Sequence, residues 1–258
     1  MVHNGLDNYL SGFEPIGLGE IESLSLMNRK DRKYVLTMGQ LGGLFADLQG
    51  FCKVLEIEGK RMSRYETYYF DTEDFELYRQ HHCGWANRYK VRFRKYVETG
   101  EYYFEVKYKN NKKETLKQRV LCAGNEREIT EVLRDFLLAN TDLNPDVLSL
   151  QLLVEYSRIT LVNFERKFRL TLDVGLRFSR GVENIISYPN IVICEVKEER
   201  GDRRLGLGRW LENRGLRRCS VSKYCLGIVA LNEGVRSNNF KKEFQLIEGL
   251  GKGYSIKN

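Results

Sequence analysis

The chain has 258 residues, 42% of them hydrophobic and 30% charged, with a net charge of +7, so it can bury a proper core as one domain. It contains neither an apolar run near the ~20 residues of a membrane span nor a hydrophobic signal segment in its first thirty residues, and we expect a cytoplasmic protein. The six cysteines form no CxxC pair and no Cys/His cluster, which is typical of reduced thiols and argues against a structural zinc site.

The first seventy residues predict strands around one short helix. Glycines and Pro15 are scattered through the N-terminal segment, which we expect to be irregular. Thr37 can cap a helix whose apolar residues, among them Leu41 and Phe45, recur at helical spacing. The predicted elements are, in chain order, an irregular arm (1–22), a long strand (24–36), a helix (37–49) and two strands (53–57 and 65–70).

A basic hairpin follows, and it is the most informative part of the sequence. Side chains two residues apart on a strand point to the same face, so Lys90, Arg92 and Arg94 share a face opposite Val91 and Phe93. On the next strand, Glu105, Lys107 and Lys109 likewise lie opposite Phe104, Val106 and Tyr108. Residues 79–119 hold twelve Lys and Arg against four Glu, a net charge of +8, which leaves −1 for the remaining chain. This face needs a polyanion or solvent beside it.

The second half of the chain alternates strands with helices. Its predicted elements are a strand (114–121), an amphipathic helix (125–138), a long strand (150–162) paired with another (167–174), a strand (190–198), a helix (203–214) and a helix (222–231) capped by Ser222. The polar segment after Gly234 predicts a loose tail. There is no internal repeat or linker, so we expect one domain over residues 1–258, with 1–22 as an arm and 234–258 as a tail.

Eight or so strands with helices between them favour an α+β fold built on an antiparallel β-barrel rather than a doubly wound parallel sheet. An ordinary barrel places apolar side chains inside and charges outside. An inverted barrel, with a polar lumen and an apolar outer face covered by helices, fits the same alternation. The period of two does not distinguish these arrangements, and both stay open.

Nine short motifs, taken together, resemble the polyphosphate polymerase domain of the vacuolar transporter chaperone (VTC) family, a branch of the CYTH-like triphosphate tunnel metalloenzymes. The resemblance covers roughly residues 29–228 and implies an antiparallel eight-stranded β-barrel tunnel, with a polar lumen and flanking helices. The motifs are Arg32-Lys33-Tyr34, Tyr69-Phe70-Asp71-Thr72, Phe75–Tyr78, Asn87–Arg94, Glu105-Val106-Lys107, Glu155–Arg158, Phe168–Asp173, Glu195-Val196-Lys197 and Ser222-Lys223-Tyr224.

The resemblance also implies an activity, the metal-dependent transfer of the ATP γ-phosphate to a growing polyphosphate chain, with Mn²⁺ or Mg²⁺ as cofactor. ATP and polyphosphate, rather than nucleic acid, would be its partners. The implied catalytic phosphate ligands are Arg92, Arg94, Lys107, Arg158 and Arg169. Further substrate-binding residues would be Lys33, His81, Lys90, Tyr156, Lys197, Ser222 and Lys223. The metal would be held by Glu195, with Glu105 as a second contact.

Each of these residues also has a structural interpretation. Glu195 can pair with Lys197, and Glu105 can be a charge partner of Lys107. Ser222 can be a helix cap and no more. A loop histidine such as His81, which stands where some family members carry an arginine, can be structural. Tyr156 fits a wall position better than a catalytic one.

The chain departs from eukaryotic relatives, because it has no room for their N-terminal SPX sensor or membrane helices. It therefore resembles a bacterial stand-alone VTC domain, which is not itself membrane-spanning and would need a separate membrane protein to export its product. Two other functions remain open. One is hydrolysis of tripolyphosphate or a nucleoside triphosphate in the same fold, and the other is non-catalytic binding of a polyanion such as RNA.

Overall fold

The computed structural model describes residues 3–24, 29–112, 114–124, 127–199, 206–251 and 254–255. Within them, thirteen strands are hydrogen-bonded into one sheet. The strands are β1 (Glu14–Ile16), β2 (Arg29–Thr37), β3 (Lys53–Leu55), β4 (Ser63–Asp71), β5 (Arg88–Tyr96), β6 (Glu101–Lys109), β7 (Thr115–Cys122), β8 (Ser149–Asn163), β9 (Phe168–Arg180), β10 (Asn184–Tyr188), β11 (Ile191–Glu199), β12 (Arg218–Cys219) and β13 (Tyr254–Ser255).

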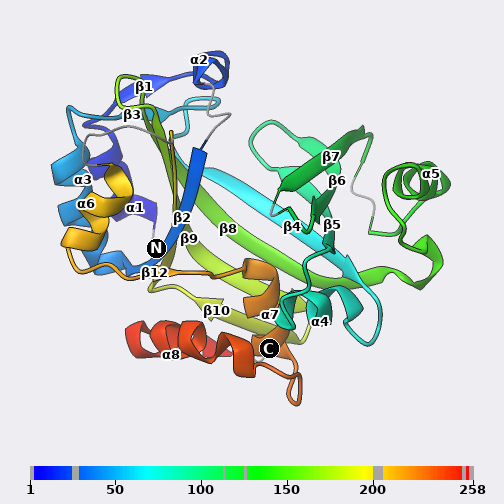
Figure 1. Cartoon of the computed structure of the whole chain (residues 1–258). Coiled ribbons are helices and arrows are strands. Elements are labelled where there is room, and N and C mark those ends of the chain that lie inside the picture. Colours follow the sequence, from blue (N-terminus) through cyan, green and yellow to red (C-terminus); the bar gives the residue numbers. More distant parts are fainter. Residues whose placement is uncertain are drawn as a thin grey trace.

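Helices surround this sheet on its outer side and at one end (Figure 1). The α-helices are α1 (His3–Leu10), α2 (Leu18–Ser23), α3 (Leu41–Leu48), α4 (Glu76–His82), α5 (Glu131–Asn140), α6 (Leu207–Asn213), α7 (Lys223–Leu231) and α8 (Lys241–Leu250). Three single turns of 3-10 helix are η1 (Met38–Gln40), η2 (Pro145–Val147) and η3 (Asn238–Phe240). In the part of the chain described, no helix is both long and apolar enough to cross a bilayer.

The main path of the sheet runs β12-β2-β11-β9-β8-β4-β5-β6-β7, and every pair of neighbours on it is antiparallel. The predicted α+β class, the β5–β6 hairpin and the pairing of β8 with β9 are confirmed. Only β1 and β3, which lie beside the main path, pair in parallel among the described strands.

The prediction of a closed barrel of eight strands is wrong. On the main path the sheet has two edges, because β12 pairs only with β2 and β7 pairs only with β6. Closure of a barrel requires hydrogen bonds between the first and last strands, with matching tilt and stagger. Here β12 is only two residues long, so it offers almost no backbone for such a contact.

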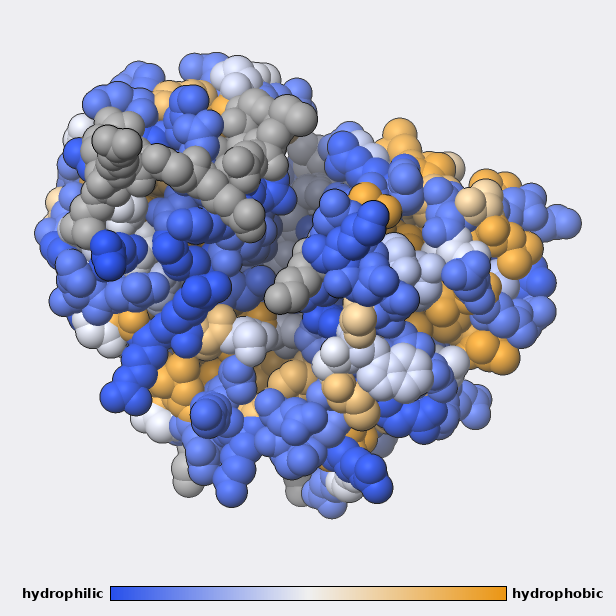
Figure 2. Space-filling model, viewed as in Figure 1, coloured by the Kyte–Doolittle hydropathy of each residue, from blue (hydrophilic) through white to orange (hydrophobic). Residues whose placement is uncertain are grey.

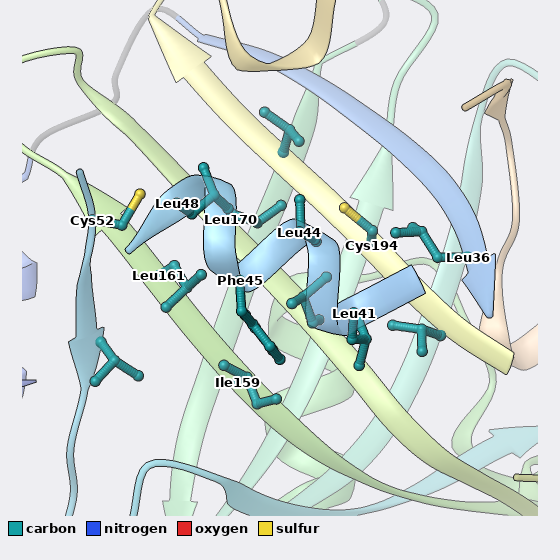
Figure 3. Packing of buried hydrophobic residues seen from close by; sticks show 14 of the residues in the cluster. Leu36, Leu41, Leu44, Phe45, Leu48, Cys52, Ile159, Leu161, Leu170 and Cys194 are labelled. Atoms are coloured by element: carbon teal, nitrogen blue, oxygen red, sulfur yellow. The ribbon is translucent and has the colours of Figure 1, made fainter. Parts of the chain in front are cut away.

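The outer face of β2, β8, β9 and β11 is apolar and covered by helices. Figure 3 shows α3 lying across these strands, with Leu41, Leu44 and Phe45 directed toward them. Leu170 and Cys194 of the strands are completely buried beneath it. α1 and α6 contribute to the same cluster of buried side chains. Burial of this apolar surface is the main driving force for docking these helices.

The outer face of the hairpin is apolar as well. Val91 and Phe93 of β5 and Phe104 and Val106 of β6 are buried in one cluster with residues of α5. The alternate side chains of the same strands are the charged ones, so they face the inside of the curled sheet (Figure 1). Of the two arrangements that the alternation allows, the molecule uses the inverted one, with polar residues inside and apolar residues outside.

Both ends of the chain differ from the sequence prediction. The sequence predicts an irregular arm over residues 1–22, but residues 3–23 contain α1, β1 and α2, and Leu10 is completely buried against α3. The segment after Gly234 was expected to be loose, but α8 buries Ile247 in a cluster with α7. These helices are short and mostly polar, so tertiary packing rather than local propensity stabilises them.

Smaller differences concern element bounds. The helix predicted at 125–138 begins only at Glu131, with Thr130 at the N-cap position but without a side-chain capping hydrogen bond, and Asn125 lies outside the described residues. The helix predicted at 203–214 is seen as α6, and residues 203–205 are likewise outside them. α4 and β10 have no counterpart in the prediction. The cap predicted at Thr37 precedes η1, which continues into α3.

Candidate functional site

The inner face of the sheet lies in a hollow between the half of the molecule built on β2, β9 and β11 and the half built on β5, β6 and β7 (Figure 2). Strand register brings side chains from many segments to this face, because residues directly opposite in a sheet point to the same side. Opposite pairs include Arg92 with Glu105 and Arg158 with Asp173. We call the hollow, with its lining of charged side chains from β2, β11, β9, β8, β5, β6 and β7, the basic groove.

The β5–β6–β7 wall of the groove concentrates positive charge. Lys90 lies directly opposite Lys107, which lies directly opposite Lys117. Such a row of like charges on facing strands is destabilising unless an anion lies against it. The pKa of each lysine is lowered: for Lys107 it falls well below the usual value, first because of Arg92 and then because of burial. For Lys90 and Lys117 burial is the main cause.

One carboxylate sits within this wall. Glu105 is completely buried, accepts a 2.6 Å hydrogen bond from Arg92 Nε and forms an ion pair with Lys117. Burial acts to raise its pKa, but Arg92 and Arg94 overcome that effect and hold the pKa well below the usual range. Glu105 therefore stays ionised and neutralises part of the cationic wall.

The β8–β9 floor combines an ion pair with stacked aromatic rings. Arg158 donates two hydrogen bonds to the Asp173 carboxylate, at 2.6 and 2.8 Å, and Lys223 binds the same carboxylate. The rings of Tyr65 and Tyr156 stack with their centroids 5.2 Å apart, and the Arg158 guanidinium lies over both. The structure thus places Tyr156 in the wall.

The β9–β11–β2 wall carries the carboxylate of Glu195. Lys33 Nζ lies 3.7 Å from it, and Lys197 donates a hydrogen bond to it. Burial would raise the pKa of Glu195, but Lys197 and Lys33 hold it well below the usual value. Arg169, opposite Lys197 on β9, has a lowered pKa because of its burial and of Arg29 and Arg158.

Buried polar atoms that lack a hydrogen-bond partner gather along the groove. Among the described residues they include Thr67 Oγ1 and Arg94 Nε, which lie on facing strands, and Arg169 Nε and Thr171 Oγ1 on β9. Buried polar groups are normally paired, so an unpaired set on one face indicates a missing ligand. Since guanidinium N–H groups only donate, that ligand must offer acceptor oxygens.

The lower end of the groove is closed off by α7 and α4, which are in contact (Figure 1). Ser222 caps α7 by accepting a hydrogen bond from Cys225 N at 3.4 Å, and its hydroxyl also accepts one from Lys90 Nζ at 2.8 Å. The prediction that Ser222 is a cap is confirmed, and the cap links α7 to the cationic wall. His81 on α4 has a buried Nδ1 without a partner, and its pKa is lowered to about 2 by burial and by Lys90.

A buried carboxylate fixes these two helices. Asp71 accepts hydrogen bonds from the N–H groups of Leu77 at 2.8 Å and Tyr78 at 2.9 Å, at the beginning of α4. Tyr224 of α7 donates its hydroxyl to the same carboxylate. Burial raises the pKa of Asp71, and these donors oppose the rise. Asp71 is thus a positioning group for the end of the groove that holds Ser222 and His81.

All fourteen residues named from the sequence lie on elements around this groove, but they do not form one compact centre. Glu105 and Glu195 stand on β6 and β11, with β9, β8, β4 and β5 between them. In the described residues no group of three or more His, Cys, Asp or Glu side chains could hold a metal ion. Glu105 pairs with Arg92 and Lys117 rather than with Lys107.

Sequence reasoning missed three kinds of site residue. Lys117 lay within a strand predicted to alternate, and its register opposite Lys107 could have been proposed from that pattern. Asp173 and Asp71 stood in motifs, but their partners come from distant segments. Tyr65 gave no signal, because an aromatic residue in a strand usually predicts core packing.

A family model described as "VTC domain" matches residues 28–232 of the chain. No curated protein matches the sequence. A Hippeastrum adenylyl cyclase candidate, described as having a dominant triphosphatase activity, is 12% identical and has a TM-score of 0.52, covering 81% of this chain and 98% of that one. A Vibrio parahaemolyticus protein described as an adenylate cyclase candidate is 14% identical, with a TM-score of 0.45, covering 78% and 99% of the two chains.

At such low identity the structural likeness shows the fold alone. The family model spans most of the sequence, including every candidate residue from Lys33 to Lys223. The chain belongs to the VTC domain family.

Proposed function

We propose that this protein is an ATP–polyphosphate phosphotransferase, which transfers the γ-phosphate of ATP to the end of a growing inorganic polyphosphate chain. With ATP as donor the reaction belongs in the cytoplasm, and export of the product would need a separate membrane protein. The proposal extends the family assignment to one reaction.

The observation that carries the proposal is a set of cationic side chains along one groove whose hydrogen-bond donors lack acceptors. Arg94 and Arg169 each have a buried Nε without a partner, and the pKa of Lys107 is lowered well below its usual value, first by Arg92 and then by burial. Polyphosphate is linear, carries about one charge per phosphate and offers only acceptor oxygens. It therefore fits both the shape and the chemistry of this lining.

The reaction needs positioning and charge neutralisation more than a covalent nucleophile. A terminal oxygen of the acceptor chain forms a bond to the γ-phosphorus of ATP, while the bond from that phosphorus to the bridging oxygen breaks and ADP leaves with it. Arg94, Arg158 and Arg169 would hold the two phosphate groups in line. Lys107 would stabilise the negative charge on the transferred group.

Glu195 is the residue best placed to hold a divalent cation. Its side chain is 20% exposed, whereas that of Glu105 is completely buried between Arg92 and Lys117 and fits the role of charge partner. Mg²⁺ is commonly bound by one or two carboxylates together with substrate phosphates, so a single protein carboxylate is compatible with Mg²⁺ or Mn²⁺. The cation would neutralise oxygen charge on the transferred phosphate.

Hydrolysis of tripolyphosphate or a nucleoside triphosphate is the second candidate. The open sheet edge favours it, because water can reach the groove more readily than it could reach a closed tunnel. The triphosphatase activity described for the Hippeastrum neighbour lies in the same fold. Water would then replace the acceptor phosphate as the attacking group.

The deciding experiment incubates the protein with ATP and Mn²⁺ or Mg²⁺ and resolves the products. We expect ADP in amounts equal to the phosphate found in long chains on a gel. Glu195→Gln should lower turnover by about 100-fold or more, because it removes the metal carboxylate. The matched control is Glu131→Gln, an exposed glutamate of α5 away from the groove, which should keep normal turnover.

If orthophosphate forms and no long phosphate chains appear, the protein is a hydrolase rather than a polymerase. If the protein does not turn over ATP but binds RNA in a salt-sensitive way, both enzymatic functions are excluded and a polyanion-binding role is supported. Full activity of Glu195→Gln would remove the metal assignment while leaving the reaction in place.

A further inference from the structure

The two ends of the basic groove differ in chemistry, and this difference gives a substrate a direction. At the α4–α7 end, the charges that act most strongly on His81 are Lys90, Arg88, Lys109 and Lys33, all positive. At the other end, beside the turn between β5 and β6, aromatic rings and the carboxylate of Glu101 accompany Arg94 and Arg119. A phosphate chain is therefore favoured more at the first end than at the second.

The aromatic end is built around Tyr103 of β6 and Arg119 of β7. Tyr103 stands opposite Arg94 in register, so its ring lies on the groove face. The Arg119 guanidinium lies 4.6 Å from the centre of that ring, and in the described part of the chain no carboxylate pairs with it. Tyr96 meets Tyr103 edge-on, with centroids 5.8 Å apart and planes at 88°. This contact fixes the orientation of the Tyr103 ring.

The pair is accessible from solvent. Arg119 is exposed and Tyr103 is half-buried. β7 is the last strand on its side of the sheet, so no further strand covers Arg119. By contrast, the neighbouring tyrosines Tyr65 and Tyr156 are 8% and 4% exposed and have no free ring face. Tyr96 is half-buried too, but among the described residues of this end only Tyr103 carries an exposed arginine on its ring, so the stack of Tyr103 and Arg119 offers a planar ligand a surface that it can reach.

From these observations we infer that Tyr103 and Arg119 form a nucleobase-stacking subsite, which binds the base of ATP while the triphosphate points along β6 toward Lys107 and Lys90. The inference rests on the proposed function for the identity of the nucleotide. Aromatic rings and arginine guanidinium planes are the two side-chain surfaces on which unpaired bases stack. Neither Tyr103 nor Arg119 is among the phosphate ligands that the family resemblance implies, although Tyr103 adjoins one of them, Arg94.

Distances along the strand agree with this orientation. Tyr103 and Lys107 are four residues apart on β6, which corresponds to roughly 13 Å. That is about the length of an extended ATP molecule from its base to its γ-phosphate. With the base at Tyr103, the triphosphate would pass Arg94 and Arg92, and the γ-phosphate would lie near Lys107. The growing chain would then leave past Lys90 and Ser222.

The inference is tested by comparing ATP with inorganic tripolyphosphate, which has the phosphates but no base. Dissociation constants for both are measured by calorimetry with the unmodified protein and the Tyr103→Leu and Arg119→Gln variants. We expect Tyr103→Leu to weaken ATP binding by about 10-fold, because one base–aromatic stack is lost, with tripolyphosphate binding changed less than 2-fold. Tyr103→Phe keeps the ring and should bind ATP like the unmodified protein.

Arg119→Gln should show the same preference, with a larger loss for ATP than for tripolyphosphate. Equal losses for the two ligands, or no loss for ATP, would overturn the subsite. Because the readout is binding, it is separate from the product assay. If the protein makes no polyphosphate but its binding of ATP depends on Tyr103, the proposed function is wrong and the subsite is supported. If the protein makes polyphosphate but these variants lose affinity for ATP and tripolyphosphate equally, the subsite is wrong and the proposed function is supported.

Discussion

At the scale of single residues, the groove is defined by cations that outnumber their partners. Glu105, Asp173 and Glu195 are each shared by two or more positive groups. This arrangement keeps the carboxylates ionised and leaves Lys107, Arg94 and Arg169 without an ion-pair partner among the described residues. The surroundings lower the pKa values of Lys107 and Arg169, which is typical of a site that binds an anion.

His81 makes this crowding measurable through pH. Its pKa is lowered to about 2 in the folded protein by burial and by the nearby lysines, against about 6.5 in an unfolded chain. Below pH 6.5 the unfolded chain therefore binds a proton that the folded protein does not, and stability falls as the pH falls. Between pH 7 and pH 5.5 we expect the protein to lose about 1 kcal/mol more unfolding free energy than His81→Gln.

Chemical denaturation of the two proteins at several pH values gives this difference directly. If both lose stability in parallel over that range, His81 is not held neutral by its surroundings.

At the scale of elements, strand alternation sorts charged from apolar faces, and helices then determine which face is inside. α3 and α5 cover the apolar sides of the two halves of the sheet. α7 docks closely because Gly227 leaves room: a Cβ at that position would lie 2.6 Å from Leu152 and Phe178 side-chain atoms. Its N-terminal residues, Ser222 and Lys223, reach across the groove from β5 to β9 as a result.

The Asp71 contact should account for much of the attachment between α4 and α7. Tyr224→Phe removes the hydroxyl that binds this buried carboxylate, and we expect the unfolding free energy to fall by about 1.5–3 kcal/mol, as for other hydrogen bonds to charged groups. The control is Tyr9→Phe, because the Tyr9 side chain is 49% exposed. Urea denaturation measures both variants. A loss no larger than that of Tyr9→Phe would show that α7 is held by packing alone.

At the scale of the whole molecule, residues 79–119 carry a net charge of +8 while the rest of the chain sums to −1, and this segment supplies one wall of the groove. Repulsion within the groove opposes folding of the ligand-free protein, and attraction favours binding of a polyanion. Added salt screens both effects. The two responses to salt must therefore have opposite signs.

We expect the melting temperature of the ligand-free protein to rise by a few degrees, roughly 2–4 °C, between 0.05 and 0.5 M NaCl. Over the same range the affinity for polyphosphate should fall by at least about tenfold. Lys107→Met removes one of the crowded charges and should reduce both responses. Thermal melts and fluorescence titrations measure them. A melting temperature that falls with salt would mean that attraction between charges, not repulsion, dominates in the groove.

The sequence alone predicted much of this. Alternation showed which residues of β5, β6, β9 and β11 share a face, because the period of a strand depends on local geometry. Nine motifs in order indicated the family. The candidate ligands named from them stand on elements around the groove, while the apolar residues between them pack in the outer clusters. The terminal helices were missed because α1 and α8 have little intrinsic preference for helix and form by packing on other elements.

Alternation left open which face is inside, although the family resemblance implied a polar lumen. Only the tertiary structure decided whether the sheet closes and which cations each carboxylate binds. Alternation is the same for a polar and an apolar interior, so the choice depends on where α3 and α5 dock. Closure depends on the twist and length of the edge strands, and β12 is too short to meet β7. The pairs Arg92–Glu105 and Arg158–Asp173 follow from strand register. Register is a relation between two paired strands, so the sequence of one strand does not determine it.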